Sequence, residues 1–250
     1  MEDSTPTVKL RPERVAALLS VITILIVIMS ILGQAIKYNY INFYMGGAWK
    51  DWKEAALDLL SQTFFMDWEA NVPTYFNTML LAVPAALFAA IAVWKKQIGD
   101  KFKNQWAGLA WIFLYLSIDE AAVIHEKLIK PVRGMFNYEG YGGLLYFAWV
   151  IPGIAVVILF ALAYLRFFLH LDNRSKIFFA AALVVYVSGI IGGEMLSGHF
   201  AETIGQKNFT YAAYTSLEES LEYFGMILMI YWLLDYIKRF LPSGIALKVE

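Results

Sequence analysis

Long apolar runs separated by short polar segments make up most of this 250-residue chain. A helix needs about 20 predominantly apolar residues to cross a bilayer. The runs that reach this length are 14–37, 74–96, 106–127, 143–169, 176–199 and 214–238. This pattern predicts an all-α polytopic membrane helix bundle with about six transmembrane helices. We expect one integral membrane domain over residues 1–250, with a short cytoplasmic tail at 1–13.

The first apolar run follows three basic residues, Lys9, Arg11 and Arg14, as a signal peptide would. It is too long for a typical signal-peptide core, and no clear small-x-small cleavage pattern follows it. We therefore expect this run to be an uncleaved anchor helix.

Basic residues beside the runs indicate the orientation, because cytoplasmic segments of membrane proteins carry an excess of Lys and Arg. With the N-terminus inside, most of the 20 Lys and Arg residues fall on the inner side. They are Lys9, Arg11, Arg14, Lys95, Lys96, Lys101, Lys103, Arg166, Arg174, Lys176, Lys238, Arg239 and Lys248. We therefore expect the N-terminus and the C-terminus to be cytoplasmic.

The longest connection, roughly residues 38–73, is on the predicted outer side and contains a shorter amphipathic pattern. The apolar residues that share one helical face are Trp49, Trp52, Ala56, Leu59 and Leu60. Such a helix typically lies in the membrane interface. We predict a short amphipathic helix near 49–61 at the outer interface.

Ionisable residues occur near the outer ends of three predicted spans, where such groups are costly and usually functional. They are Asp119, Glu120, His125, Glu126, Glu194, His199, Glu218, Glu219 and Glu222. Since a helix rises about 1.5 Å per residue, each span offers one deep carboxylate and one shallower group. We expect a deep layer of Asp119, Glu194 and Glu222, and a shallow layer of His125, Glu126, His199 and Glu218 or Glu219.

Carboxylates and imidazoles on facing helices are suitable ligands for zinc, iron or manganese. The metal ligands that we predict are Asp119, His125, Glu194, His199, Glu219 and Glu222. Glu126 or Glu218 would then act as the general base on a metal-bound water. Di-iron bundles use Glu-x-x-His pairs. None occurs here, so a single zinc with an open position is an equal possibility.

Two further patterns bear on this cluster. The small residues Ser188, Gly189, Gly192, Gly193, Ser197 and Gly198 follow a spacing that lets membrane helices approach closely. The entry to the second span is also polar and could form a lid or supply extra ligands, with Asp67, Glu69, Asn71, Thr74 and Asn77. A structural explanation also exists, because Ser216 and Glu219 match a capping box at a helix start.

Three stretches of the chain, MDWEANVPTYFNTMLLAVPAAL, FLYLSIDEAAVIHEKL and SLEESLEYFGMILMIYWLL, resemble a family of uncharacterised bacterial multi-pass membrane proteins. The resemblance implies an inner-membrane protein, which with the orientation above has its cluster facing the periplasmic or extracellular side. Ser117, Asp119 and His125 are also similar to the zinc sites of membrane ceramidases and adiponectin-receptor-like hydrolases. The paired-histidine motif of that superfamily is missing here.

Three functions remain open from the sequence. The first is a metal-dependent membrane hydrolase or oxidase acting on a lipid-like or small substrate. The second is an accessory or structural subunit of a larger respiratory or photosynthetic complex, in which His125 and His199 could hold a haem or a pigment. The third is a cation or proton transporter.

Composition narrows the partners and cofactors. The formal net charge is −1, which gives no reason to expect a nucleic-acid partner. The chain contains no cysteine, which excludes disulfides, iron–sulfur clusters and thiolate zinc sites. The expected partners are membrane lipids, with other membrane subunits or a second copy of the chain as further possibilities.

Overall fold

The computed structural model describes residues 10–39, 51–135 and 142–241, and every regular element in these ranges is helical. The α-helices are α1 (Pro12–Asn39), α2 (Trp52–Phe64), α3 (Val72–Gln97), α4 (Lys103–Ala122), α5 (Ile124–Lys127), α6 (Ile129–Met135), α7 (Val150–His170), α8 (Asn173–Val187), α9 (Glu194–Thr203) and α10 (Phe209–Phe240). A short 3₁₀ turn, η2, covers Gly143–Leu145, and a π-helical segment, η3, covers Ser188–Gly193. The predicted all-α class is confirmed.

Five helical stretches in the described residues are long and apolar enough to cross a membrane. They are α1, α3, α7, the continuous run α8–η3–α9, and α10. A sixth span results if α4 and the segment Ile124–Met135 count together, although the chain bends by 69° between them. The prediction of about six spans is confirmed in this sense.

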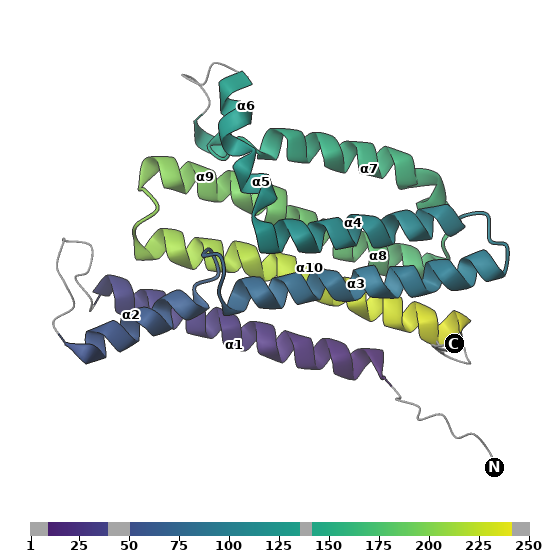
Figure 1. Cartoon of the computed structure of the whole chain (residues 1–250), viewed down its shortest axis with the longest axis horizontal. Helices are drawn as coiled ribbons and strands as arrows, with labels where there is room; N and C mark the ends of the chain where they lie inside the picture. The colour runs from purple at the N-terminus through teal and green to yellow at the C-terminus, as the bar shows by residue number, and fades with distance from the viewer. Residues whose placement is uncertain (1–9, 40–50, 136–141, 242–250) are drawn as a thin grey trace, which may run out of the picture.

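Successive spans run in opposite directions, so the bundle has two distinct ends (Figure 1). We call one the basic end; it carries Lys95, Lys96, Arg174, Lys238 and Arg239, together with the start of α1 and the end of α10. We call the other the acidic end; it contains the end of α4, the start of α9 and the connection between α2 and α3.

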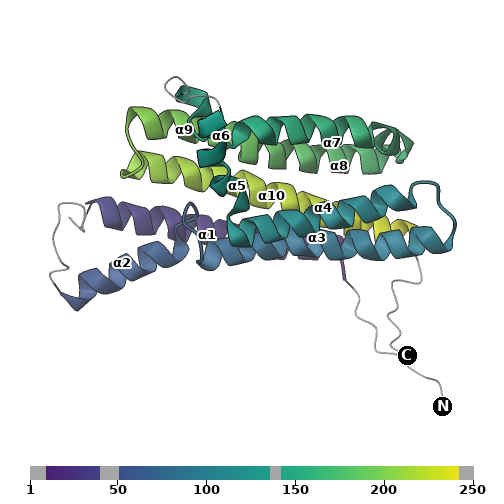
Figure 2. The ribbon, with the colours of Figure 1, turned by 45° about the horizontal axis from the view of Figure 1, so that its top comes forward.

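Helix α10 is the centre of the bundle and packs against α1, α3 and α8. In its most apolar stretch 61% of the residues are buried, compared with 11% in α7, which lies at the periphery (Figure 2). The core between α3, α4 and α10 is aromatic. Phe88 contacts Trp106, Phe113 and Trp232 at ring-centroid distances of 5.2–6.0 Å. These side chains fill the bundle between the acidic and the basic end.

The predicted amphipathic helix is present as α2, and Asp51 caps its first turn by accepting from the backbone N–H of Lys53 and Glu54. Trp49 lies outside the described residues. The expected apolar face is exposed, while Asp58 and Ser61 on the opposite face are buried against α1. There Asp58 pairs with Lys37 at 3.8 Å. Helix α2 runs alongside α1 (Figures 1 and 2).

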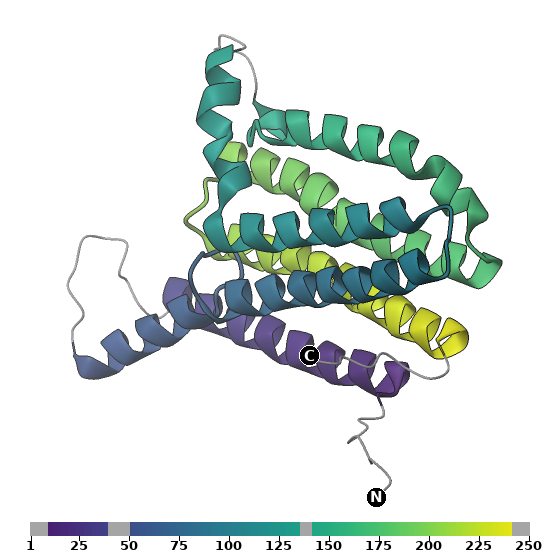
Figure 3. The same cartoon turned by 45° about the vertical axis from the view of Figure 1, so that its right-hand side comes forward.

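Two element boundaries differ from the prediction in ways that affect the site. Helix α4 ends at Ala122 and not at residue 127, and α5 and α6 lead away crosswise to the bundle (Figures 1 and 3). Helix α10 begins at Phe209, where Asn208 is the N-cap. The capping-box interpretation of Ser216 and Glu219 is therefore wrong, because both residues lie in the interior of α10.

Candidate functional site

A cavity of about 390 Å³ opens at the acidic end of the bundle. Its walls come from the α2–α3 connection, the segment before α7, the α9–α10 connection, and α1, α3, α4, α5, α8, η3, α9 and α10. The carboxylates that line it are Asp67, Glu69, Asp119, Glu120, Glu126, Glu194, Glu219 and Glu222. Among the described residues, the basic side chains in the lining are His125 and Lys207. The cavity is therefore strongly acidic.

Asp119 and His125 form a tight pair at the break between α4 and α5. One carboxylate oxygen of Asp119 accepts from the backbone N–H of His125 at 2.9 Å, and the other lies 2.8 Å from the ring atom Nδ1. The turn between them uses Val123, whose φ of 54° is left-handed and rare for a β-branched residue. Backbone strain of this kind is found most often at functional sites.

This pair replaces the two layers that we expected. A continuous helix would have placed His125 about 9 Å nearer the surface than Asp119. Instead the chain folds back, and the two side chains are in direct contact. The layered arrangement is wrong at this point because α4 stops at Ala122.

Trp149, just before α7, connects His125 with Glu194. Its ring lies against the imidazole of His125 at a centroid distance of 4.8 Å. Its indole N–H donates to the carboxylate of Glu194 at 2.9 Å. A pair from α4 and α5 and a carboxylate from α9 thus share one wall of the cavity.

The glycines of η3 bring α10 close to the cavity wall, as the spacing of small residues predicted. A Cβ atom at Gly189 would lie 2.7 Å from Cγ of Glu222, and one at Gly193 would lie 2.5 Å from Cγ of Glu218. π-Helical segments inside α-helices occur frequently at functional sites. Here the segment lets two acidic side chains of α10 fit against a bare backbone.

The α2–α3 connection supplies two more acids at the cavity. Burial, followed by repulsion from Glu194 and Glu126, raises the pKa of Asp67 well above its usual range. Burial of the carboxyl, followed by repulsion from Glu120 and Glu126, raises the pKa of Glu69 to about 7. Both acids are thus held in a field of like charge, which favours a bound proton or cation.

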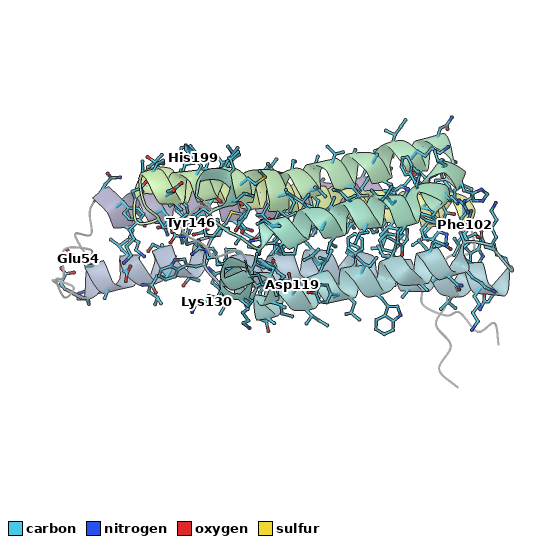
Figure 4. The ribbon with its side chains drawn as sticks, turned by 90° about the horizontal axis from the view of Figure 1, so that it is seen from above. Glu54, Phe102, Asp119, Lys130, Tyr146 and His199 are labelled. Carbon is cyan, nitrogen blue, oxygen red and sulfur yellow. The ribbon has the colours of Figure 1, made fainter. Side chains whose placement is uncertain are left out.

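Six of the eight residues that we predicted for the site line this cavity, namely Asp119, His125, Glu126, Glu194, Glu219 and Glu222. His199 does not line it and is exposed on α9, apart from Asp119 (Figure 4). Glu218 is buried beside Glu194 and Gly193 and is also outside the lining. The helix spacing could not distinguish these two from their neighbours.

Among the lining residues that sequence reasoning missed are Trp149, Tyr186, Lys207 and Tyr211. The aromatic residues among them carry no distinct signal, since aromatic residues near span ends are expected as interfacial belts. Asp67 and Glu69 were foreseen as a lid or as extra ligands, and both do line the cavity.

The described residues contain no group of three or more His, Asp or Glu side chains close enough together to hold a metal ion. The acids surround a shared space, but they do not converge on one point. Any ion bound here would need some of these side chains to rotate toward it.

The comparisons with known proteins give a family and no activity. A search of curated proteins and of solved structures found no match. A family model described as "Domain of unknown function (DUF8692)" matches residues 15–236, which is most of the chain. The chain therefore belongs to the uncharacterised membrane-protein family DUF8692.

Proposed function

We propose that the acidic cavity binds a zinc, iron or manganese ion and that the protein is a metal-dependent membrane enzyme. The observation that carries this proposal is the excess of carboxylates over basic groups around one cavity. Ionised carboxylates that are removed from water must be paired with a cation or protonated. A bound metal ion supplies the missing positive charge.

His125 is the residue best prepared to bind the ion. Asp119 holds its Nδ1 at 2.8 Å, which leaves Nε2 available as a ligand. A carboxylate on the far nitrogen is the usual support of a metal-binding histidine, because it fixes the tautomer and the ring orientation. Glu194, which Trp149 holds nearby, and Glu126 would complete the site by a change of rotamer and not of backbone.

The same site supplies a base for hydrolysis. A metal ion lowers the pKa of its bound water, and a nearby group then removes the proton. Glu69 suits this role, because its pKa is raised to about 7 and a general base works best near the operating pH. Glu126, a base suggested by the sequence, also lines the cavity and is exposed, as Glu69 is. Glu218 lies outside the lining, and we assign it no catalytic role.

A groove beside the cavity supports a lipid-like substrate. Trp68 and Glu69 belong to both, and the groove continues over Leu59, Val72 and Tyr75. Tyr75 is 76% exposed, as expected for a side chain that faces lipid. An apolar chain in the groove would bring its polar group to Glu69 at the cavity mouth.

The charge distribution supports a site on the outer side of the membrane. The clusters of Lys and Arg lie at the basic end, and the positive-inside rule favours a cytoplasmic position for this end. The cavity at the opposite end would then face the periplasm of a bacterial inner membrane.

Transport is less well supported, although broken helices beside a polar site are typical of transporters. The aromatic core below the cavity is tightly closed, and Phe88, Trp106 and Trp232 are at most 2% exposed. The described residues therefore offer no polar route from the cavity to the basic end. A haem bound between His125 and His199 is also unsupported, because His199 lies outside the cavity.

An accessory role rests on one observation. Helix α7 has only 11% of its most apolar stretch buried, which leaves its surface to lipid or to a neighbouring subunit. This observation is compatible with enzyme activity and does not replace it.

Trp149 offers a direct test of metal binding. Its ring touches His125 and its N–H is bonded to Glu194, so an ion on either residue changes its fluorescence. Subtracting the emission of Trp149→Phe from that of the wild-type protein isolates the emission of Trp149. This difference should change when Zn²⁺ or Mn²⁺ is added after chelator treatment. His125→Ala should remove that change. Elemental analysis without bound transition metal, together with an unchanged difference in emission, would contradict the proposal.

A further inference from the structure

Asn77 lies behind the cavity lining, beside two of the acids that line the cavity, Glu120 and Glu222. It is completely buried on α3, next to the carboxyl groups of Glu120 from α4 and Glu222 from α10. Neither its Oδ1 nor its Nδ2 has a hydrogen-bond partner among the described residues. The amide lies close enough to interact with both carboxyl groups, but none of these contacts has the geometry of a normal hydrogen bond.

Such an arrangement is costly unless another atom fills the gap. Buried polar groups are nearly always hydrogen-bonded, and an exception calls for a strained site or for a water or ion. Buried carboxylates side by side also repel each other. One cation between the amide oxygen and the two carboxylates would give Oδ1 a partner and remove the repulsion between the carboxylates.

We propose that Asn77, Glu120 and Glu222 form a site for a divalent cation that prefers oxygen ligands, Ca²⁺ or Mg²⁺. All three side chains supply oxygen atoms, which are the ligands that hard cations select. Two carboxylates and a neutral amide balance a charge of +2. The site differs in chemistry from the one at His125, which includes an imidazole and suits zinc, iron or manganese.

The packing of three helices fixes the site formed by Asn77, Glu120 and Glu222, which we call the floor site. Gly189 lets Glu222 lie directly against the π-helical segment, so that the backbone of η3 closes one side. Tyr223, the next residue of α10, is bonded through its hydroxyl to the carbonyl oxygen of Pro73 at 2.9 Å, which ties α10 to the start of α3. Glu120 and Glu222 also line the cavity, so water from the cavity can supply further ligands.

The floor site adds to the proposed function and does not depend on it. An ion at Asn77 would neutralise the acids and order α3, α4 and α10 even if His125 binds nothing. Conversely, a metal ion at His125 does not require Asn77, because the contacts that hold His125 and Glu194 come from Asp119 and Trp149.

The test is calorimetric titration of the chelator-treated full-length protein with Ca²⁺ and with Mg²⁺, combined with thermal unfolding. The wild-type protein should bind one of these ions and unfold at a higher temperature in its presence, because the ion binds only the folded state. Asn77→Leu should weaken binding at least about 10-fold, the loss typical even for an outer-shell partner of a metal. Asn77→Asp keeps the oxygen ligands and should keep the binding.

A matched control is available at the other end of α4. Oδ1 of Asn77 and Oε1 of Gln105 are both buried and unpartnered, but Gln105 lies far from the acids. Gln105→Leu should leave the response to the ion unchanged.

Two results would overturn the proposal. One is a wild-type protein that neither binds Ca²⁺ or Mg²⁺ nor changes its unfolding temperature, as expected if only a water bridges Asn77 to the acids. The other is an Asn77→Leu protein that folds and binds as the wild type does. Loss of the Trp149 fluorescence response in His125→Ala, with Ca²⁺ or Mg²⁺ binding retained, would separate the two sites.

Discussion

The two ends of the bundle use the same kind of side chain in opposite ways. At the basic end, Asp235 accepts from Arg174 at 2.9 and 3.0 Å and from Arg239 at 2.8 Å, and Arg239 also bonds to Asp172. Lys95 bonds to Asp100 at 2.8 Å. At the acidic end, carboxylates outnumber the basic groups around one cavity, and Asn77 is left without a partner among the described residues.

This difference separates a structural network from a binding site. Buried acids that are paired with arginine need nothing further, and such a network connects helix ends that are distant in sequence. Acids that are gathered without enough partners are costly to the fold, so that a ligand is needed to compensate for them. We therefore assign the basic end to the fold and the acidic end to function.

The largest effect is expected from removing a charge at the basic end. Asp235→Asn leaves Arg174 and Arg239 without their shared carboxylate, and breaking a buried ion pair is strongly destabilising. We expect a loss of about 3 kcal/mol of unfolding free energy, toward the lower part of the usual range because Arg174 is half exposed. An SDS unfolding titration measures it. A change smaller than that of a surface substitution would show that the network is not structural.

The next largest effect is expected where α10 meets α8. A Cβ atom at Gly225 would lie 2.6 Å from the backbone nitrogen of Tyr186, which cannot move aside as a side chain can. Gly225→Ala should therefore lose roughly 2 kcal/mol, as overpacked cores do. Gly192→Ala is the control, because a Cβ atom there meets nothing within 4 Å. Equal unfolding midpoints for the two variants would contradict the close approach.

Neutralising an acid at the acidic end should have the opposite sign. In chelator, Glu222→Gln removes one of several repelling carboxylates, and we expect a gain of roughly 1 kcal/mol, the size of an ordinary single-residue effect. The same SDS titration as for Asp235→Asn makes the comparison direct. Destabilisation by Glu222→Gln in chelator would mean that Glu222 is already fully compensated by its neighbours.

The contribution of each end to the unfolding free energy should change with pH in opposite directions. Glu69 has a pKa raised from 4.5 to about 7, so its protonated form stabilises the fold below pH 4.5. That contribution is lost as the pH rises through about 7. Glu69→Gln should flatten the fall in unfolding midpoint over this range. A wild-type slope that Glu69→Gln leaves unchanged would show that another group titrates.

At the basic end the sign is reversed. Burial alone would raise the pKa of Asp172, but hydrogen bonds from Ser175 and Arg239 outweigh it and lower the pKa below 3.8. Asp172 therefore contributes stability above this value and loses it as the pH falls. Its contribution stays constant over the range in which Glu69 titrates, so the two ends can be measured separately.

Much of the fold follows from the sequence because the signals are long. Apolar runs of membrane length predict the spans. The number of Lys and Arg residues alternates between high and low in successive connections, which predicts which span ends lie on the same side. The small residues around Gly189 and Gly193 predict the close approach of α10, since no side chain intervenes there. The helical periodicity of the apolar residues after Trp52 predicts α2.

The site was harder to predict because it depends on a break that no Pro or Gly announces. The stretch from Ser117 to Leu128 has a helical pattern throughout, but Asp119 accepts the backbone N–H of His125 and so competes with the helix. Residues beyond the break therefore turn back toward Asp119. His199 was misplaced for a related reason, because spacing gives its depth but not the direction in which it faces.

Crystals grown with Mn²⁺ would test the central claim, that the acidic end binds cations, most directly, because Mn²⁺ suits both proposed sites and its anomalous scattering marks its position. We predict an anomalous peak at His125, and a second between Asn77, Glu120 and Glu222 that is absent from Asn77→Leu. A map without a peak inside the cavity, at a Mn²⁺ concentration that saturates any binding seen in solution, would contradict the account.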